Sequence, residues 1–326
     1  DWSVSEGPSL ITDVSKQFVR KSDKSKYQTV SSGYAMLAAH VFIQNKLIRS
    51  CPQDENLPKL LIIGQKGSGK ATLCRLCAGW VGAHVHELNL KTIHRDVMAE
   101  NGYESGQYLD EMLQTKISSI FATAMEARPA IVLIQDVERV FITNSDRDKE
   151  TPVAKLARRL KQFLFEQIEK SQGIEKLIIV ATSSYPDDCV GKDHQEFRNF
   201  FHTIVHLPLP SHRSRAMKIR QALEKFNNIN EDQEDEVSKW GLITASADDI
   251  VGCTWRDIDH SMQQACGALP DNATLTQALQ LFKFYAKSTR DREHINKRHV
   301  ALIDWLCLAL PGQSPKQSKQ QIKRHL

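Results

Sequence analysis

The sequence lacks any long hydrophobic run, because no stretch approaches the roughly 18 apolar residues that a membrane-spanning helix requires. It also lacks a strong excess of charge, since 43 basic and 39 acidic residues give a formal net charge of +4. The composition therefore does not call for a polyanion such as nucleic acid as the partner. Hydrophobic residues make up 41% of the chain and charged residues 25%, which is ordinary for a globular protein and excludes disorder throughout.

The seven cysteines are an odd number in a chain without a signal-like start. Free thiols in a reducing compartment fit this count better than a disulfide framework does. Cys74 and Cys77 form a C-x-x-C pair, but no second such pair and no His pair at ligand spacing accompanies them. We therefore interpret both as small buried hydrophobic residues and assign no metal ligand. The chain begins at Asp1 rather than Met, so we expect a fragment of a longer protein.

Residues 64–71, GQKGSGKA, match the phosphate-binding pattern G-x-x-x-x-G-K-[ST] except at the last position. In that pattern backbone N–H groups surround the phosphates, the lysine reaches the β and γ oxygens, and the final hydroxyl ligates Mg²⁺. An apolar run at 60–63 precedes the loop and apolar residues at helical spacing follow it, which is the required order of strand, turn and helix. The predicted nucleotide-binding residues are Gly64, Gly67, Ser68, Gly69, Lys70, Ala71 and Thr72.

Short apolar runs alternate with amphipathic helices between residues 58 and 210, which predicts a parallel α/β sheet. The expected strands are Leu60–Ile63, His84–Leu88, Ile131–Ile134, Leu177–Ala181 and Ile204–Leu207. After Pro210 the pattern is helical, with one of the expected helices at 247–268. The predicted units are an N-terminal lead-in with one helix (1–57), a nucleotide-binding α/β domain (58–210), a helical lid domain (211–288), and a C-terminal helix with a basic tail (289–326).

A phosphate-loop hydrolase needs acidic residues at the end of a neighbouring strand, to organise the Mg²⁺ and its water and to activate the attacking water. Residues 131–138, IVLIQDVE, have this shape, with four apolar residues followed by polar ones. Together with the loop, this segment resembles the AAA family of ATPases. Further resemblances follow in order at residues 128–132, 177–184, 201–210 and 251–258. The resemblance implies a P-loop NTPase fold of the AAA+ type, with a five-stranded parallel sheet, helices on both faces and a small α-helical lid.

Each catalytic position departs from the active family pattern. Ala71 lacks the metal-ligating hydroxyl, Gln135 replaces the Mg²⁺-associated carboxylate, and Asp136 is one methylene shorter than the water-activating Glu. Ser183 replaces the Asn that senses the γ-phosphate, and the arginine-finger positions fall on Asn199 and Phe200. The candidate catalytic residues are Asp136, Gln135, Glu138, Ser183 and Arg198. Since an arginine finger contributes a factor of about 10³–10⁵ in rate, these losses predict weak or absent hydrolysis. Nucleotide binding survives, because Lys70 and the backbone N–H groups do not need the metal.

Within the family, residues 67–73 and 83–88 are similar to the degenerate first ATPase domain of the peroxisome-biogenesis branch, of the peroxin-one type. This resemblance implies a domain that binds ATP or ADP, with Mg²⁺ weak or absent. It implies assembly with other AAA subunits in a homo- or hetero-hexamer that remodels a protein substrate or adaptor during peroxisome biogenesis and protein import. The expected location is cytoplasmic, peripheral on the peroxisomal membrane. No second phosphate loop is present, so a double-ring protein would be represented here by one domain.

Two other functions stay open. Residues 136–141 and 181–184 are also similar to the second ATPase domain of the vesicle-fusion branch, and hydrolysis would survive if Thr72, Glu138 and Arg198 took over the missing roles. A nucleic-acid initiator or clamp-loader relative is the other alternative, supported only by basic residues after position 286. Because no aromatic interleaving accompanies those charges, we predict no nucleic-acid partner.

Overall fold

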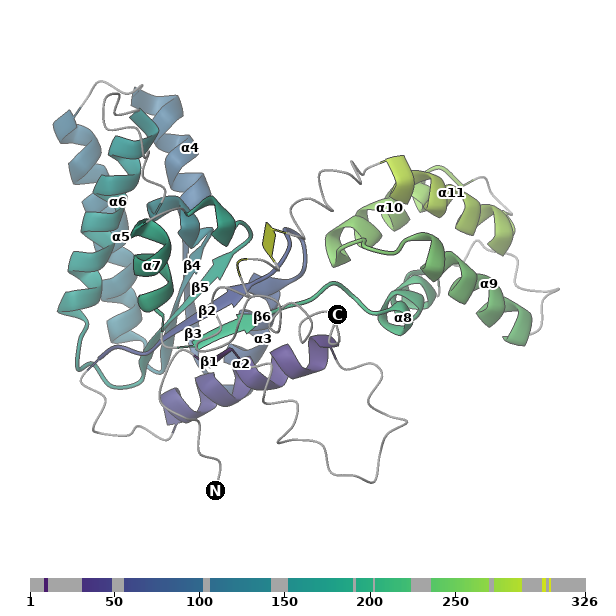
Figure 1. The fold of residues 1–326 in the computed structure, drawn as a ribbon, viewed down its shortest axis with the longest axis horizontal. Coiled ribbons are helices and arrows are strands. Elements are labelled where there is room, and N and C mark those ends of the chain that lie inside the picture. The colour runs from purple at the N-terminus through teal and green to yellow at the C-terminus, as the bar shows by residue number, and fades with distance from the viewer. Residues whose placement is uncertain are drawn as a thin grey trace.

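The computed structural model describes residues 9–10, 31–48, 56–101, 106–141, 152–189, 192–201, 203–223, 236–269, 273–288, 301–302 and 305. Within these ranges an α/β unit lies beside a group of four helices (Figure 1). An extended segment after the last strand connects the two parts. None of the helices among the described residues is long and apolar enough to cross a bilayer.

The sheet contains all five predicted strands. They are β2 (Lys59–Ile63), β3 (His84–Asn89), β4 (Ala130–Gln135), β5 (Leu177–Ser183) and β6 (Thr203–His206). These strands pair in parallel in the order β6-β2-β5-β4-β3. A two-residue strand that the sequence did not predict, β1 (Ser9–Leu10), pairs in parallel with β6 at the edge, so the sheet has six strands. The expectation of a parallel α/β sheet is confirmed.

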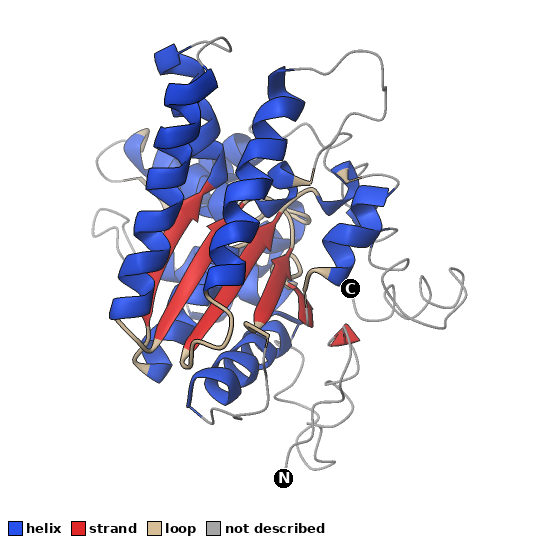
Figure 2. Ribbon diagram, turned by 90° about the vertical axis from the view of Figure 1, so that its left-hand side faces the viewer, coloured by secondary structure: helices blue, strands red, loops and turns tan. Residues whose placement is uncertain are grey.

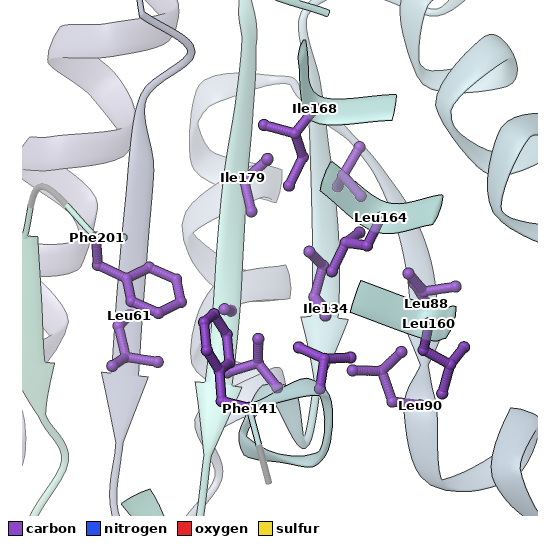
Figure 3. Close-up of a cluster of buried hydrophobic side chains, with 14 of the residues drawn as sticks. Leu61, Leu88, Leu90, Ile134, Phe141, Leu160, Leu164, Ile168, Ile179 and Phe201 are labelled. Atoms are coloured by element: carbon purple, nitrogen blue, oxygen red, sulfur yellow. The ribbon is translucent and has the colours of Figure 1, made fainter. Parts of the chain in front are cut away.

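Hydrophobic side chains fill both faces of the sheet, because successive residues of a strand point to opposite sides. On β4, Val132 and Ile134 belong to one buried cluster, whereas Ile131 and Leu133 belong to the other. Figure 2 shows the strands between helices, and Figure 3 shows part of the first cluster. The first cluster packs under α4 (Leu90–Asn101), α5 (Gly106–Glu126), α6 (Pro152–Lys170) and α7 (Lys192–Asn199). The second packs under α2 (Ser31–Ile48) and α3 (Lys70–Val81).

The remaining helices form a lid with a hydrophobic core of its own. They are α8 (His212–Leu223), α9 (Glu236–Asp249), α10 (Trp255–Gly267) and α11 (Leu275–Ser288). The single helix expected at 247–268 is wrong, because α9 ends at Asp249 and α10 begins at Trp255. The new start is set by a capping box, in which the Thr254 hydroxyl accepts from the Asp257 N–H while the Asp257 carboxylate accepts from the Thr254 N–H.

Part of the segment after the lid returns to the α/β unit. Leu302 and Trp305 are buried in the first hydrophobic cluster, and the Trp305 ring lies 5.9 Å from that of Phe197. The expected C-terminal helix is represented by these positions, while the basic tail at 313–326 lies outside the described residues. Most of the lead-in at 1–30 lies outside them as well.

Candidate nucleotide site

The loop and two of the polar strand ends meet at one edge of the sheet. Ile63 at the end of β2 is paired with Ser183 at the end of β5, and Thr182 is paired with Gln135 at the end of β4. The Gly64 N–H donates to the Ser183 carbonyl at 3.2 Å, which ties the loop to β5. The carboxyl ends of parallel strands at a crossover are where α/β folds bind ligands.

Two glycines give the loop its turn, since Gly67 and Gly69 have φ angles of 89° and 92°. Residues other than glycine rarely adopt this left-handed backbone conformation. Ser68 closes the turn by donating its N–H to the Gln65 carbonyl at 3.1 Å, and α3 begins directly afterwards at Lys70. The helix N-terminus therefore follows the curled loop, an arrangement that binds anions through backbone N–H groups.

Lys70 is the buried cation of the site, with an exposed fraction of 8%. Its ammonium donates to the Gly64 carbonyl at 2.8 Å, the Gln65 carbonyl at 2.9 Å and the Ser184 hydroxyl at 2.9 Å, so all three of its hydrogens have acceptors. Burial lowers the pKa of Lys70 to about 8, although the charges of Glu138 and Asp136 act to raise it. Lys70 is thus held inside the loop, where a bound anion would stabilise its charged form.

Glu138 is a buried carboxyl behind this lysine, with an exposed fraction of 3%. Its Oε1 accepts from the backbone N–H groups of Ser184 at 3.2 Å and Tyr185 at 3.3 Å. Burial raises the pKa of the Glu138 carboxyl, and hydrogen bonds from backbone N–H groups oppose that rise. Glu138 Oε1 is therefore held by the turn that follows β5.

Several buried polar atoms around the loop make no hydrogen bond within the described part of the protein. They are Gln65 Nε2, Ser68 Oγ and Glu138 Oε2. Buried polar groups normally have partners, and leaving one unsatisfied costs about 1–3 kcal/mol. Two of the three atoms belong to the phosphate loop itself. The residues present therefore fit a polar, phosphate-bearing ligand at this position.

The positions expected to hold Mg²⁺ do not fit a metal. The Ala71 side chain packs against the second hydrophobic cluster. Thr72 is exposed, about 100° further round α3, so it does not replace the missing hydroxyl. Gln135 Nε2 donates to Glu87 Oε2 at 2.9 Å, and Glu87 forms a two-point ion pair with Arg75 at 2.6 and 2.9 Å.

This ion pair was missed by the sequence analysis. The Arg75 hydrogen bond and charge lower the pKa of Glu87, so its carboxylate is already neutralised by the protein. Arg75 and Glu87 form this pair at the surface, where both side chains remain partly exposed. No local spacing points to this pair, because Arg75 and Glu87 lie on different elements, twelve positions apart.

The remaining predicted catalytic residues lie in two places. Asp136 adopts a left-handed backbone with φ of 56° directly before the 3-10 helix η2 (Val137–Val140), close enough for its charge to raise the pKa of Lys70. Arg198 lies in the last turn of α7 and is not among the contacts of Lys70. Phe200, an expected finger position, packs into an aromatic cluster with Phe165 and Phe201 at centroid distances of 4.9 Å.

The first turn of α10 lies on the loop, and this also was missed. The Arg256 N–H donates to the Gly67 carbonyl at 3.2 Å, and the Arg256 charge acts on Lys70, whose pKa it lowers. Trp255 contacts the space next to Gly69, where an added Cβ would lie 3.7 Å from its Cδ1. The lid therefore contributes a cation and an indole to the mouth of the site.

Gly67→Ala should weaken the contact between the loop and the lid. A Cβ at this position would lie 2.6 Å from Thr254 Oγ1 and 2.9 Å from Arg256 Cβ, and the left-handed backbone adds about 1–2 kcal/mol of strain. We expect a loss of about 2 kcal/mol or more of unfolding free energy in denaturant titrations. Gly79→Ala is the matched control, because it lies in α3 with nothing within 4 Å of the added Cβ. Equal stability of both variants would contradict the proposed contact.

The model of the ATPase family associated with various cellular activities (AAA) matches residues 60–203. Mouse dynein regulatory complex protein 11 is 27% identical over 169 residues, which are 51% of this chain and 18% of that protein. Peroxisomal ATPase PEX6 of Cricetulus griseus is 23% identical over 210 residues, which are 64% of this chain and 19% of that protein. The chain thus spans under a fifth of the length of these curated relatives. The FIGL-1 AAA domain in complex with ADP has a TM-score of 0.54 at 14% identity, with 91% of each chain covered, which shows the fold alone.

Proposed function

We propose that this chain binds ATP or ADP and hydrolyses it weakly or not at all. Residues 60–203 form an AAA domain distantly homologous to PEX6 and other AAA ATPases, which supports nucleotide binding. The observation that carries the proposal is the combination of an intact lysine cradle with a metal position built from Ala71 and Gln135. The neighbouring FIGL-1 structure was solved with ADP, which supports a nucleotide of this class.

Each residue has a defined part in that proposal. The loop N–H groups and the α3 N-terminus bind phosphate oxygens, and Lys70 supplies the buried positive charge. Arg256 adds a second cation from the lid. The phosphates of a bound nucleotide would supply the negative charge that pairs with Lys70, Arg256 and the loop N–H groups. Position 135 holds an amide rather than a carboxylate, so it offers no charged ligand for a metal.

The test is nucleotide titration by calorimetry with Mg²⁺ and with EDTA, on the same protein preparation. We expect the dissociation constants for ADP in the two conditions to agree within about threefold, because no side chain at position 71 or 135 gains from the metal. Binding that requires Mg²⁺, with a dissociation constant at least tenfold lower in its presence, would contradict the proposal. Absence of binding in both conditions would refute nucleotide binding altogether.

The biological setting that we propose is assembly in a hexameric protein-remodelling ATPase of peroxisome biogenesis and protein import, with the chain peripheral on the peroxisomal membrane. Support comes from the similarity to PEX6, which is a peroxisomal ATPase by name, and from the sequence resemblance to the peroxin-one type. The experiment is co-purification of tagged full-length protein with AAA partner subunits. The mass of the purified particle is then measured in the presence and in the absence of ATP. A particle of one chain in both conditions would contradict the assembly role.

A second candidate is a structural part in a dynein regulatory assembly. It rests on one observation, the 27% identity to dynein regulatory complex protein 11 over half of this chain. Nucleotide binding without turnover suits this role as well, so the two settings separate by partner rather than by chemistry. Co-purification with dynein regulatory complex proteins instead of peroxisomal ones would select it.

A further inference from the structure

The first two helices of the lid carry exposed arginine and apolar side chains. On α8, Arg213, Met217 and Arg220 lie at helical spacing on one face, and all three are exposed. On α9, Val237 and Trp240 are exposed one helical turn apart. We call these residues the lid patch. Figure 1 shows α8 and α9 on one side of the lid, with α10, which contacts the phosphate loop, on the other.

The two halves of the lid patch are neighbours, because α8 and α9 pack against each other in opposite directions. The Arg220 guanidinium lies 5.8 Å from the centroid of the Trp240 ring. Towards the other end of the pair, Arg215 Nε donates to the Ala247 carbonyl at 2.9 Å. Trp240 is 37% exposed and Val237 is 80% exposed, so the described residues leave apolar surface of both side chains in water. Exposed apolar groups that lie together mark interaction sites more often than single ones do.

The arginines give the lid patch a positive charge. The sequence of α8 contains Arg213, Arg215, Lys218 and Arg220 and no acidic residue. Arg215 is buried and donates to two backbone carbonyls, and Lys218 pairs with an aspartate of α10 at 2.8 Å. The arginines of α8 that face water are therefore Arg213 and Arg220. The two aspartates of α9 lie in its last turn and pair with other residues of the lid.

We propose that the lid patch binds an acidic segment of a partner protein, which places an apolar side chain against Trp240. Trp, Met and Arg are enriched in protein interfaces, and Trp and Arg often dominate the binding energy. The two exposed arginines favour carboxylates by charge complementarity, and the flexible thioether of Met217 adapts to an aliphatic or aromatic side chain. A nucleic acid offers phosphates to the arginines but no aliphatic side chain to cover Met217 and Val237, so a peptide fits this surface better.

Gly241 supports the approach of a partner at this place. It lies inside α9 directly after Trp240 and is exposed, and an added Cβ would meet nothing within 4 Å. Glycine forms helices poorly, and neither close packing nor a positive φ requires it at this position. A residue without a side chain does allow another chain to approach the helix backbone closely. Gly241→Ala should therefore stabilise the free protein and weaken the binding of the partner.

The experiment selects ligands for the full chain from a library of random peptides and measures their dissociation constants by fluorescence anisotropy. We expect the selected peptides to have an excess of Asp and Glu and an aromatic or aliphatic anchor. Trp240→Ala and Arg220→Glu should each weaken these peptides about tenfold or more. The matched controls are Phe284→Ala and Lys287→Glu, at exposed positions of α11, which should stay within about twofold of wild type.

The selection is repeated on a variant with amides at the acidic positions of 231–236, so that this acidic stretch before α9 does not compete for the arginines. Gly241→Ala should raise the midpoint of thermal unfolding and weaken the selected peptides about fivefold. A purely structural role of this face would not produce those two effects together. If Trp240→Ala does not fold, Arg220→Glu decides alone, because its side chain is exposed.

Several results would overturn the proposal. Selected peptides without an acidic excess, peptides that bind equally to Arg220→Glu, or failure of the selection on both proteins would each do so. If sedimentation shows that Arg220→Glu only dissociates a complex of identical chains, the occupant is a second copy of this chain. An oligonucleotide that binds wild type and is lost in Arg220→Glu would assign the patch to nucleic acid instead. ADP affinity should be unchanged in Arg220→Glu, so failure of this inference leaves the proposed nucleotide binding untouched.

Discussion

Lys70→Ala will reduce nucleotide affinity at least a hundredfold, which is the largest effect on binding that we expect from any single substitution in the chain. The lysine is 8% exposed and is directed into the loop by two loop carbonyls and Ser184. A hydrogen bond to a charged group contributes about 1.5–3 kcal/mol, so a Lys70 ammonium that exchanges two of its present acceptors for phosphate oxygens would contribute about 3 kcal/mol to binding. Calorimetric titration with ADP in EDTA measures this loss directly.

Lys66→Ala is the matched control, because Lys66 lies in the same loop but is exposed to solvent. We expect its ADP dissociation constant to stay within about threefold of wild type, since exposed charges are well screened. Equal losses in the two variants would mean that general positive charge attracts the nucleotide. An unaffected Lys70→Ala protein would mean that the loop is not the phosphate site.

The same lysine sets the pH dependence of binding. Burial lowers the pKa of Lys70 from an ordinary value of 10.5 to about 8, and phosphate binds the protonated form. Affinity is therefore full below pH 8 and falls as the pH rises through 8, by up to about tenfold per pH unit. Titrations between pH 7 and 9.5 should show this fall in wild type and in Lys66→Ala alike. A flat profile would contradict the assignment of Lys70 as the cation that contacts the phosphates.

The fold was predictable because its signal is repeated and local. Five apolar runs of strand length separated by amphipathic helices gave the parallel sheet, and every predicted strand forms. The loop was predictable for a similar reason, since glycines and a lysine at fixed spacing between a strand and a helix have few other interpretations. The prediction of one helix at 247–268 in the lid failed, because apolar periodicity continues across the break between α9 and α10. The capping box at Thr254 begins α10 there.

The surroundings of the loop were not predictable from spacing. Arg75 and Glu87 are twelve positions apart, and Lys70 and Ser184 are 114 apart, so their contacts depend on how α3 and β5 pack rather than on any local pattern. Arg256 reaches Gly67 from a different part of the fold. Side chains of β5 alternate between the two faces of the sheet, and Ile178 and Val180 face α3. This alternation places Ser184 on the α3 side, so the sequence lacked only the information about which residues of β5 face α3.

The second large effect that we expect concerns turnover. Wild-type protein should release phosphate from ATP at a rate at least about 10³-fold below that of an AAA ATPase with an arginine finger in place, because position 200 is a phenylalanine packed among aromatic rings. A phosphate-release assay with Mg²⁺ measures the rate, and Lys70→Ala gives its background. Turnover above that background, abolished in Lys70→Ala, would instead support the working ATPase with rearranged catalytic residues.

Restoring the metal position separates the two expected causes of this low rate, which are the missing metal ligands and the missing arginine finger. The combination Ala71→Thr, Gln135→Asp and Asp136→Glu returns the hydroxyl and both carboxylates, but the new Asp would stand beside Glu87, whose oxygen now lies 2.9 Å from the Gln135 amide. We expect Gln135→Asp alone to be destabilising and therefore add Glu87→Gln, which removes the like-charge pair. The four-residue variant should bind ATP about tenfold more tightly with Mg²⁺ than with EDTA, whereas wild type should not. Its turnover should nevertheless stay low, because the expected arginine-finger positions still hold Asn199 and Phe200. Fast hydrolysis by this variant would show that the finger is supplied elsewhere, with Arg198 as the first residue to test.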